Sequence, residues 1–387
     1  MRRYPPDVEE NIRAERQLRE WARSGLIGAD VSASLHADVR VDLRRTNDSL
    51  RLTLFAFTAV ILTSAVWLFG ELLGIHDATS FAFIHALSAL LSFGLADFLV
   101  ARGRLYRFGV EEALAMGAVV LLGFSAGEFA SPEISATTSM RLPMTIALAA
   151  VAVGALCVYL RFGYLFAAIL SMAAAAGIAF PLIESHVGQR VLAAAVFVLV
   201  FFFARAIRRP HGEDYPGDEY GVIQTAAWIG MYLVLNLRMP GGGEFQFAFY
   251  WTTYALTWLI PTIGLTVGIR EKQREMILAN LSLAIITLVT NKPYLRLARH
   301  SWDPILLGVL LMGVAVLLRR WFVNGPDSAR YGFTSKRLLA GDLRAIRVAG
   351  MASAVIQPGM ASHASPSNTP LKPGGGQSGG GGASGSF

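Results

Sequence analysis

Charged residues are scarce in this chain. They make up 16% of its 387 residues, whereas soluble domains carry about 25%. Hydrophobic residues make up 54%. They gather in runs of about twenty, each long enough to cross roughly 30 Å of hydrocarbon as a helix. The sequence therefore argues against a soluble enzyme and predicts an all-α fold, a polytopic bundle of transmembrane helices.

Cysteine and lysine are also scarce. Cys157 is the single cysteine, which excludes an intrachain disulfide and a cysteine-based metal site. Because it lies within an apolar run, we expect it to be a small buried hydrophobic side chain. Lysine occurs four times, so arginine supplies 30 of the 34 basic residues. This bias is typical of GC-rich bacterial genomes.

The start of the chain lacks the apolar stretch of a secretory signal. The first apolar run begins near Leu52, after the polar segment 1–50, whereas the apolar part of a signal peptide begins within the first few residues. We therefore expect this run to remain in the mature protein as its first span.

Ten apolar runs have the length and composition of membrane spans. They cover residues 52–74, 79–100, 112–130, 142–160, 162–183, 190–207, 220–237, 247–268, 275–291 and 304–322. If both termini are cytoplasmic, only six of the 34 basic residues fall in outer segments, as the positive-inside rule requires. The sequence therefore predicts about ten helices, N-in and C-in, in a bacterial inner membrane. The net charge of +7 then indicates contact with anionic lipid at the cytoplasmic face, not with nucleic acid.

The segments outside the spans differ in character. We predict a cytoplasmic helical hairpin over 1–50, the transmembrane bundle over 51–323, an amphipathic juxtamembrane segment over 324–357, and a disordered Gly/Ser/Pro tail over 358–387. The second helix of the hairpin is expected to be capped by Asp30 and to continue toward the first span.

Ionisable side chains within the predicted spans are the first candidates for a functional site, because each costs at least about 2.5–3.5 kcal/mol in hydrocarbon. Asp97 lies about one turn from the cytoplasmic end of its span, near Arg102 and Arg104. His85 and Glu128 lie toward the outer side. Each has a structural interpretation, an ion pair or an interhelical hydrogen bond, and a functional one, a place in a proton, ion or substrate pathway.

Acids and histidines also gather near the predicted outer rim: Glu71, His76, Asp77, Glu128, Glu133, Glu184 and His186. Such residues bind divalent metals when they converge. Here each one ends a different helix, so solvated helix ends are the favoured interpretation and no metal site is predicted.

The outer loop 291–303 runs against the charge bias. If it is helical, Lys292, Arg296 and Arg299 share one face, and His300 follows them. One interpretation is an interfacial helix whose long side chains reach the membrane surface. The other is a basic strip that holds an anionic substrate or a lipid head group.

The eighth run contains proline and glycine, and the runs beside it carry asparagines. Pro261, Gly264 and Gly268 can bend the helix or let a neighbour approach closely. Asn236, Asn280 and Asn291 place amides on the flanking runs and could line the same cavity. Plain helix packing produces the same pattern.

Several catalytic signatures are missing. The sequence contains no Walker loop, no dinucleotide-binding glycine pattern after a strand, no HExxH helix and no GxSxG elbow. His85 stands alone within the spans, so paired haem ligands are missing as well. We therefore predict no catalytic residue and no cofactor, which weakens the enzyme hypothesis.

One short segment looks familiar. Residues Leu18-Arg19-Glu20-Trp21, followed by Ser24-Gly25-Leu26-Ile27-Gly28 and a helix leading to the first span, resemble predicted bacterial membrane proteins of unknown function. Those proteins begin with a short cytoplasmic module and continue as a multi-helix bundle. The resemblance covers about 50 residues; it implies a fold type and no activity.

Three functions remain open. A transporter or permease for a small solute predicts that His85, Asp97 and Glu128 face a central cavity. A non-catalytic scaffold that recruits a cytoplasmic protein partner predicts a filled bundle with those residues paired. A lipid-handling enzyme using the loop 291–303 requires a groove open to lipid beside His300 and Asp303.

Overall fold

The computed structural model describes most of the chain. It covers residues 4, 6–23, 27–39, 41–75, 77–131, 140–208, 219–237, 247–295, 297, 300, 302–323, 329–330 and 333–334. The predicted disordered tail and nearly all of the predicted juxtamembrane segment lie outside these residues, as do Arg296 and Arg299.

The described residues form thirteen helices and one two-stranded ladder. The helices are α1 (Pro6–Arg23), α2 (Ala29–Asp38), α3 (Asp48–Leu72), α4 (Ala78–Gly103), α5 (Val110–Phe129), α6 (Arg141–Phe162), α7 (Leu165–Gly177), α8 (Ala179–Leu182), α9 (His186–Arg208), α10 (Glu219–Leu235), α11 (Phe247–Arg270), α12 (Arg274–Tyr294) and α13 (Asp303–Val323). Strands β1 (Ala329–Arg330) and β2 (Phe333–Thr334) pair antiparallel. The predicted all-α fold is confirmed.

The long helices follow the predicted spans, with α7 and α8 together forming the fifth. Eight of the described helices are long and apolar enough to cross a membrane, namely α3 to α6, the α7–α8 pair, α9, α11 and α12. They fit a multi-pass membrane protein. Their exposed surfaces are largely apolar, with Leu52, Leu90 and Leu199 each about 70% exposed. Lipid is the solvent in which such surfaces are stable.

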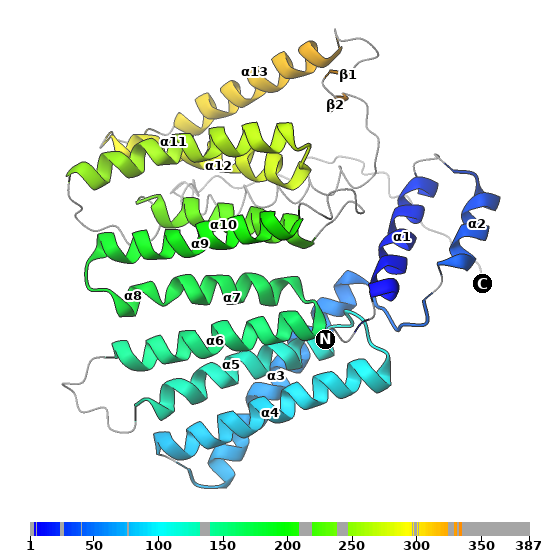
Figure 1. Cartoon of the computed structure of the whole chain (residues 1–387), viewed down its shortest axis with the longest axis vertical. Helices are drawn as coiled ribbons and strands as arrows, with labels where there is room; N and C mark the ends of the chain where they lie inside the picture. The colour runs from blue at the N-terminus through cyan, green and yellow to red at the C-terminus, as the bar shows by residue number, and fades with distance from the viewer. Residues whose placement is uncertain are drawn as a thin grey trace, which may run out of the picture.

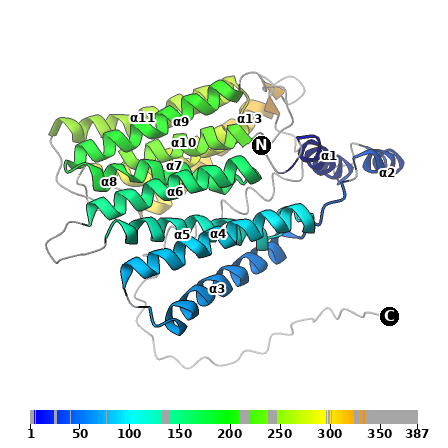
Figure 2. The same ribbon diagram turned by 60° about the horizontal axis from the view of Figure 1, so that its bottom comes forward.

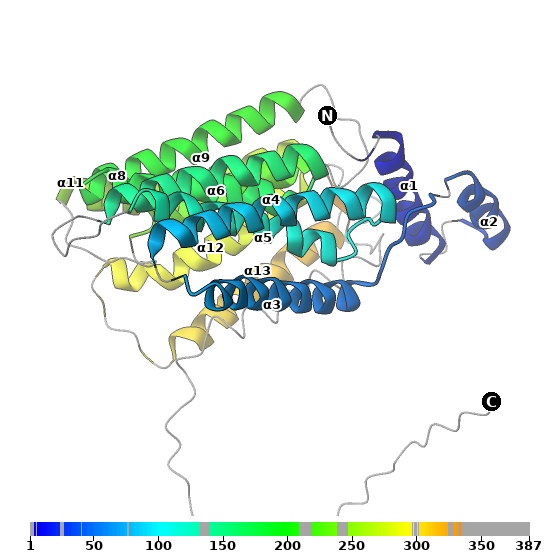
Figure 3. The ribbon, with the colours of Figure 1, turned by 90° about the horizontal axis from the view of Figure 1, so that it is seen from below.

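The long helices lie side by side as a row of antiparallel neighbours (Figure 1). Helix α3 lies outside this row, against α4 and α5 (Figure 2 and Figure 3). In the row, α10 packs on α9, and the pair α11–α12 packs on α10. The turns α4–α5, α6–α7 and α11–α12 lie at the end of the bundle near α1 and α2 (Figure 1). These three predicted cytoplasmic turns thus lie at one end of the bundle with the N-terminal helices, while the side of the membrane they face stays a prediction.

Local sequence explains where several helices begin and turn. The side chains of Asn47 and Asp77 cap α3 and α4 by accepting the N–H groups of Leu50 and Ser80, which satisfies donors that a helix leaves free at its start. Gly109, before α5, has φ +108, and a Cβ there would overlap the carbonyl group of Arg51. Only glycine fits this close approach of α3 to the α4–α5 turn.

The N-terminal helices differ from the expectation in two respects. The N-cap of α2 is Gly28, while Asp30 lies within the first turn. The helix ends at Asp38 and does not continue toward α3; residues 41–47 are not helical. Within this segment Arg44 donates its N–H to Arg104 and accepts that of Tyr106, at 2.9 and 3.1 Å. These backbone bonds hold the connection to α3 against the α4–α5 turn.

The expectation for Cys157 is wrong. Its side chain lies on an exposed face of α6, while its neighbours Ala155 and Val158 are buried at 0% and 1% exposure. Helical periodicity places position 157 on the side of α6 away from these two residues, which is why its apolar surroundings in the sequence did not imply burial.

Candidate functional site

His85 and Glu128 meet between α4 and α5. His85 Nδ1 lies 2.7 Å from Glu128 Oε2, and the two side chains are 15% and 27% exposed. The rings of Phe81 and Phe124 lie 6.0 and 5.8 Å from the imidazole. His85 and Glu128 therefore form the interhelical hydrogen bond that the structural interpretation predicted. A role of these two residues in a proton, ion or substrate pathway remains a prediction.

Asp97 pairs with Arg161, in the last turn of α6. Arg161 Nη2 lies 2.8 Å and Nε 2.9 Å from Asp97 Oδ1. Arg161 ends α6, so this pair joins α4 to α6 near the end of the bundle occupied by α1. An arginine at a helix C-terminus also interacts favourably with the helix dipole.

The loop after α12 is described only in part. Arg296 and Arg299 lie outside the described residues, so their predicted shared face with Lys292 remains a prediction. Lys292 Nζ lies 2.6 Å from Asp303 Oδ1 and 5.3 Å from the ring centre of Trp302. The N–H of His300 donates to Asp303 Oδ2 at 3.0 Å. These contacts form the corner between α12 and α13.

The outer acids and histidines do not converge where the structure describes them. Among described residues, no three His, Cys, Asp or Glu side chains form a group that could hold a metal ion. His76 and Glu133 lie outside the described residues. Glu184 pairs with Arg141 at 2.7 Å, and both side chains are more than half exposed.

A row of neutral polar side chains lies between α10, α11 and α12. We call it the polar seam and define it as Trp228, Tyr232, Asn236, Tyr250, Tyr254, Thr257, Asn280, Thr287, Thr290, Asn291 and Tyr294. On α12 the buried members follow a spacing of three and four, at 280, 287, 290 and 294, with the apolar Leu283 between them. This spacing aligns side chains along one face of a helix. The seam includes all three asparagines that the sequence singled out.

Hydrogen bonds connect the middle of the polar seam across the three helices. Asn236 donates to Tyr232 Oη at 3.1 Å, and Tyr232 Oη lies 2.8 Å from Thr287 Oγ1. Thr287 donates to backbone carbonyls, with the oxygens of Thr257 and Leu283 at 2.9 and 3.0 Å. Since a hydroxyl has one proton, Tyr232 is then the donor to Thr287. The result is a directed chain of donors from α10 through α12 to α11.

The two ends of the seam are also bonded. At one end, Trp228 Nε1 donates to Asn280 Oδ1 at 2.9 Å. At the other, Tyr254 donates to Asn291 Oδ1 at 2.7 Å, and the backbone N–H of residue 237 donates to Tyr294 Oη at 2.6 Å. From Asn280 to Tyr294 the seam extends about 21 Å along α12, at about 1.5 Å per residue, which is most of the roughly 30 Å thickness of a hydrocarbon core.

Helix α11 contributes to the seam by close approach and remains continuous. It passes through Pro261 without a break from Phe247 to Arg270, so the helix interruption considered from the sequence does not occur. A Cβ at Gly264 would overlap the Asn280 side chain. Gly264 therefore lets α11 approach α12 at the level where Asn280 meets Trp228.

Two buried acids at the start of α5 were missed by the sequence reasoning. Glu111 and Glu112 are 0% and 2% exposed. Arg51 Nε donates to Glu112 Oε2 at 2.6 Å, and the N–H of Phe108 donates to Glu111 Oε1 at 2.6 Å. A run of acids at a helix N-terminus interacts favourably with the helix dipole, which was the available signal. This cluster ties α3 to α5.

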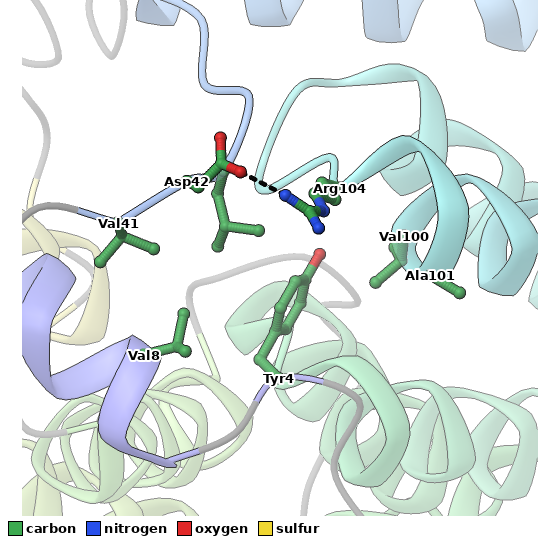
Figure 4. A pocket seen from close by; sticks show the side chains of 8 residues that line it. Tyr4, Val8, Val41, Asp42, Val100, Ala101 and Arg104 are labelled. Carbon is green, nitrogen blue, oxygen red and sulfur yellow. Dashed lines mark hydrogen bonds and ion pairs between the residues drawn. The ribbon is translucent and has the colours of Figure 1, made fainter.

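A hollow of about 470 Å³ lies where the N-terminal segment meets α4. Figure 4 shows Tyr4 and Arg104 on its wall, with Arg104 paired to Asp42. The Tyr4 hydroxyl donates to the Leu105 carbonyl at 2.7 Å, and burial raises the pKa of this phenol above its usual value. The hollow thus lies at the end of the bundle, in the contact between the N-terminal segment and α4.

Comparisons with known proteins add no family to this description. No family model matches the chain, and no curated protein or solved structure is detectably similar to it. The fold and the polar seam therefore have to support any functional assignment by themselves.

Proposed function

We propose that this protein is a transporter of the bacterial cytoplasmic membrane that moves a small uncharged polar solute along the polar seam. The supporting observation is the row of hydroxyl and amide groups between α10, α11 and α12, which the apolar Leu283 interrupts once, between Asn280 and Thr287. Such groups can replace the water of hydration of a polar solute as it crosses hydrocarbon. Since the seam side chains are neutral, they offer no counter-charge to an ion, and an uncharged solute is the better match.

The packing of the seam favours a carrier over an open pore. Its members are hydrogen-bonded to one another, so a solute can enter only when α10 separates from α11 and α12. Interhelical hydrogen bonds in membranes contribute only about 0.6 kcal/mol each on average. A few of them can therefore be exchanged for bonds to a solute at low cost, which is what alternating access requires.

Flux measurements on the purified full chain test this proposal. Proteoliposomes are loaded with buffer, and uptake of radiolabelled lactamide, erythritol and mannitol is compared with uptake of labelled glutamate and choline. We expect uptake of at least one uncharged solute above that of empty liposomes, and no such excess for the ions. Wild-type protein that raises the uptake of none of the three uncharged solutes would contradict the proposal.

A matched pair of variants connects the flux to the seam. Thr287→Val removes the hydroxyl that joins Tyr232 to α11 and is expected to reduce uptake. Thr262→Val removes a hydroxyl of the same kind from an exposed face of α11, where it bonds only its own helix at Trp258. Uptake by Thr262→Val should equal that of wild type. Equal uptake by all three proteins would place the pathway elsewhere.

A second candidate function, a membrane scaffold that recruits a cytoplasmic protein, is favoured by two observations. His85 is paired with Glu128 and Asp97 with Arg161, as this hypothesis predicts. Helices α1 and α2 lie beyond the end of the bundle (Figure 1) and expose Trp21, Val31 and Leu35 at 37%, 53% and 38%. Deleting residues 1–40 should abolish partner capture and leave uptake unchanged if both functions exist. The lipid-handling hypothesis is supported only by the sequence. Asp303, one of the residues that it requires beside a groove, is paired with Lys292 in the structure.

A further inference from the structure

Two buried side-chain amides on neighbouring helices differ in their hydrogen bonding. Asn280 is 0% exposed and both ends of its amide are bonded, the oxygen by Trp228 Nε1 at 2.9 Å and the nitrogen to the Met276 carbonyl at 2.8 Å. Gln224 on α10 is also 0% exposed. Neither its Oε1 nor its Nε2 has a hydrogen-bond partner among the described residues. The two amides carry the same chemistry, so the difference lies in their surroundings.

Gln224 continues the line of the polar seam. It lies four residues before Trp228, so the two side chains are stacked one above the other on α10. Its neighbour Thr225 is buried too, but the Thr225 hydroxyl bonds the Gly221 carbonyl at 2.8 Å. Gln224 thus presents an open donor and an open acceptor one turn beyond the bonded end of the seam.

Burying an amide without hydrogen-bond partners destabilises the folded protein. A polar atom withdrawn from water without a hydrogen-bond partner destabilises the folded state, and a leucine of similar size at this position would avoid that cost. The fold instead keeps an amide whose two hydrogen-bonding atoms lie side by side. The complement of that arrangement is a group that offers an acceptor to the amide nitrogen and a donor to the amide oxygen, as a second carboxamide or a urea does.

From these observations we infer that Gln224 is the solute-binding residue of the seam, and that the solute carries a donor and an acceptor side by side, as in a primary carboxamide or a urea. That the ligand is a transported solute rests on the proposed function. Binding of the ligand to Gln224 can be tested without transport. Recognition is thus assigned to Gln224, one turn beyond the end of the polar seam, and passage to the polar seam itself.

Stability and binding measurements on the full chain in detergent test the site. Gln224→Leu removes the two unpaired atoms and is expected to raise the unfolding temperature. The control is Gln273→Leu, which removes a buried amide that is already bonded to Glu271 and should lower it. In calorimetric titrations with lactamide, the wild type should bind at least about tenfold more tightly than Gln224→Leu, the effect of losing one hydrogen bond to an otherwise unpaired amide. N,N-dimethyllactamide, which lacks the amide donors, should bind no better to wild type than to the variant.

The outcomes separate this inference from the proposed function. Lactamide binding that depends on Gln224, in a protein that moves no uncharged solute, supports the site and contradicts transport. Solute uptake that is unchanged by Gln224→Leu supports transport and overturns the inference. If Gln224→Leu destabilises the protein as Gln273→Leu does, and lactamide does not bind, the amide has a partner within the fold and the inference is wrong.

Discussion

The two halves of the bundle bury polarity in opposite ways. Between α3 and α6, charged side chains meet in pairs across the helices: Arg51 with Glu112, whose side chain is 2% exposed, and Asp97 with Arg161, whose side chains are 26% and 34% exposed. Between α10, α11 and α12, neutral hydroxyls and amides meet through hydrogen bonds. Burying a charge costs far more than burying a hydroxyl. The charged pairs accordingly lie near helix ends, whereas the neutral seam extends through the middle of its helices.

This difference separates two roles. A buried ion pair is strongly destabilising when only one partner is removed, so it fixes how helices meet. A neutral hydrogen bond is weaker and can be exchanged. The charged half is therefore suited to hold the bundle together, and the neutral half is suited to open around a polar solute. The following changes test that division, from the largest expected effect to the smallest.

The largest loss of stability should come from Glu112→Gln in the charged half. The variant leaves Arg51 beside a neutral amide, and the Glu112 side chain is only 2% exposed. Breaking a buried pair costs about 3–5 kcal/mol, and we expect a value near the lower limit because Arg51 is 31% exposed. Unfolding in mixed micelles with increasing SDS measures the change.

The matched control for this prediction is Glu184→Gln. It breaks the pair with Arg141, whose members are 85% and 53% exposed, and should change stability by less than about 1 kcal/mol. Equal losses in the two variants would show that charge removal, not burial of the pair, determines the effect.

In the neutral half, Gly264→Ala should have an intermediate effect. The added methyl group would overlap the Asn280 side chain, and such overpacking costs about 1–3 kcal/mol. It should also break the bond from Trp228 and reduce solute uptake. Gly94→Ala on α4 is the control, because no heavy atom lies within 4 Å of a Cβ there. A Gly264 variant that behaves like the Gly94 variant would mean that α11 and α12 are not held in close contact.

The positions of the helices could be predicted from the sequence, since a span needs only an apolar run of sufficient length, and that requirement is local. The partners of the charged residues could not. Asp97 was expected beside Arg102 and Arg104, which are close in sequence, but its partner is Arg161, 64 residues away. To predict Arg161 as the partner, one must know that the ends of α4 and α6 lie close together, and this depends on the packing of the whole bundle.

The polar seam was visible only in part for a related reason. Asn236, Asn280 and Asn291 are rare enough in apolar runs to attract notice. Tyr232 and Thr287 are not, because hydroxyl side chains are common in membrane helices and often bond only their own backbone. Their role follows from the meeting of α10 and α12, and the spacing along α12 was the one local signal that pointed to it.

The smallest effect should come from the Lys292–Asp303 pair at the α12–α13 corner, whose side chains are 34% and 22% exposed. It tests how much a partly exposed pair stabilises this protein. The Lys292 ammonium group, and the backbone N–H of His300, lower the pKa of Asp303 below its ordinary value. A carboxyl group with a lowered pKa stabilises the folded state above about pH 3.9, the usual value for Asp, and this contribution is lost as the pH falls through the lowered pKa. Wild type should therefore unfold at a slightly higher temperature than Asp303→Asn at pH 7 and pH 5, and the gap should shrink below about pH 4. Lys292→Met should show the same small deficit at pH 7. A gap that widens as the pH falls would contradict the lowered pKa of Asp303. A gap as large as the loss in Glu112→Gln would show that partly exposed charges stabilise this fold as much as a buried pair does.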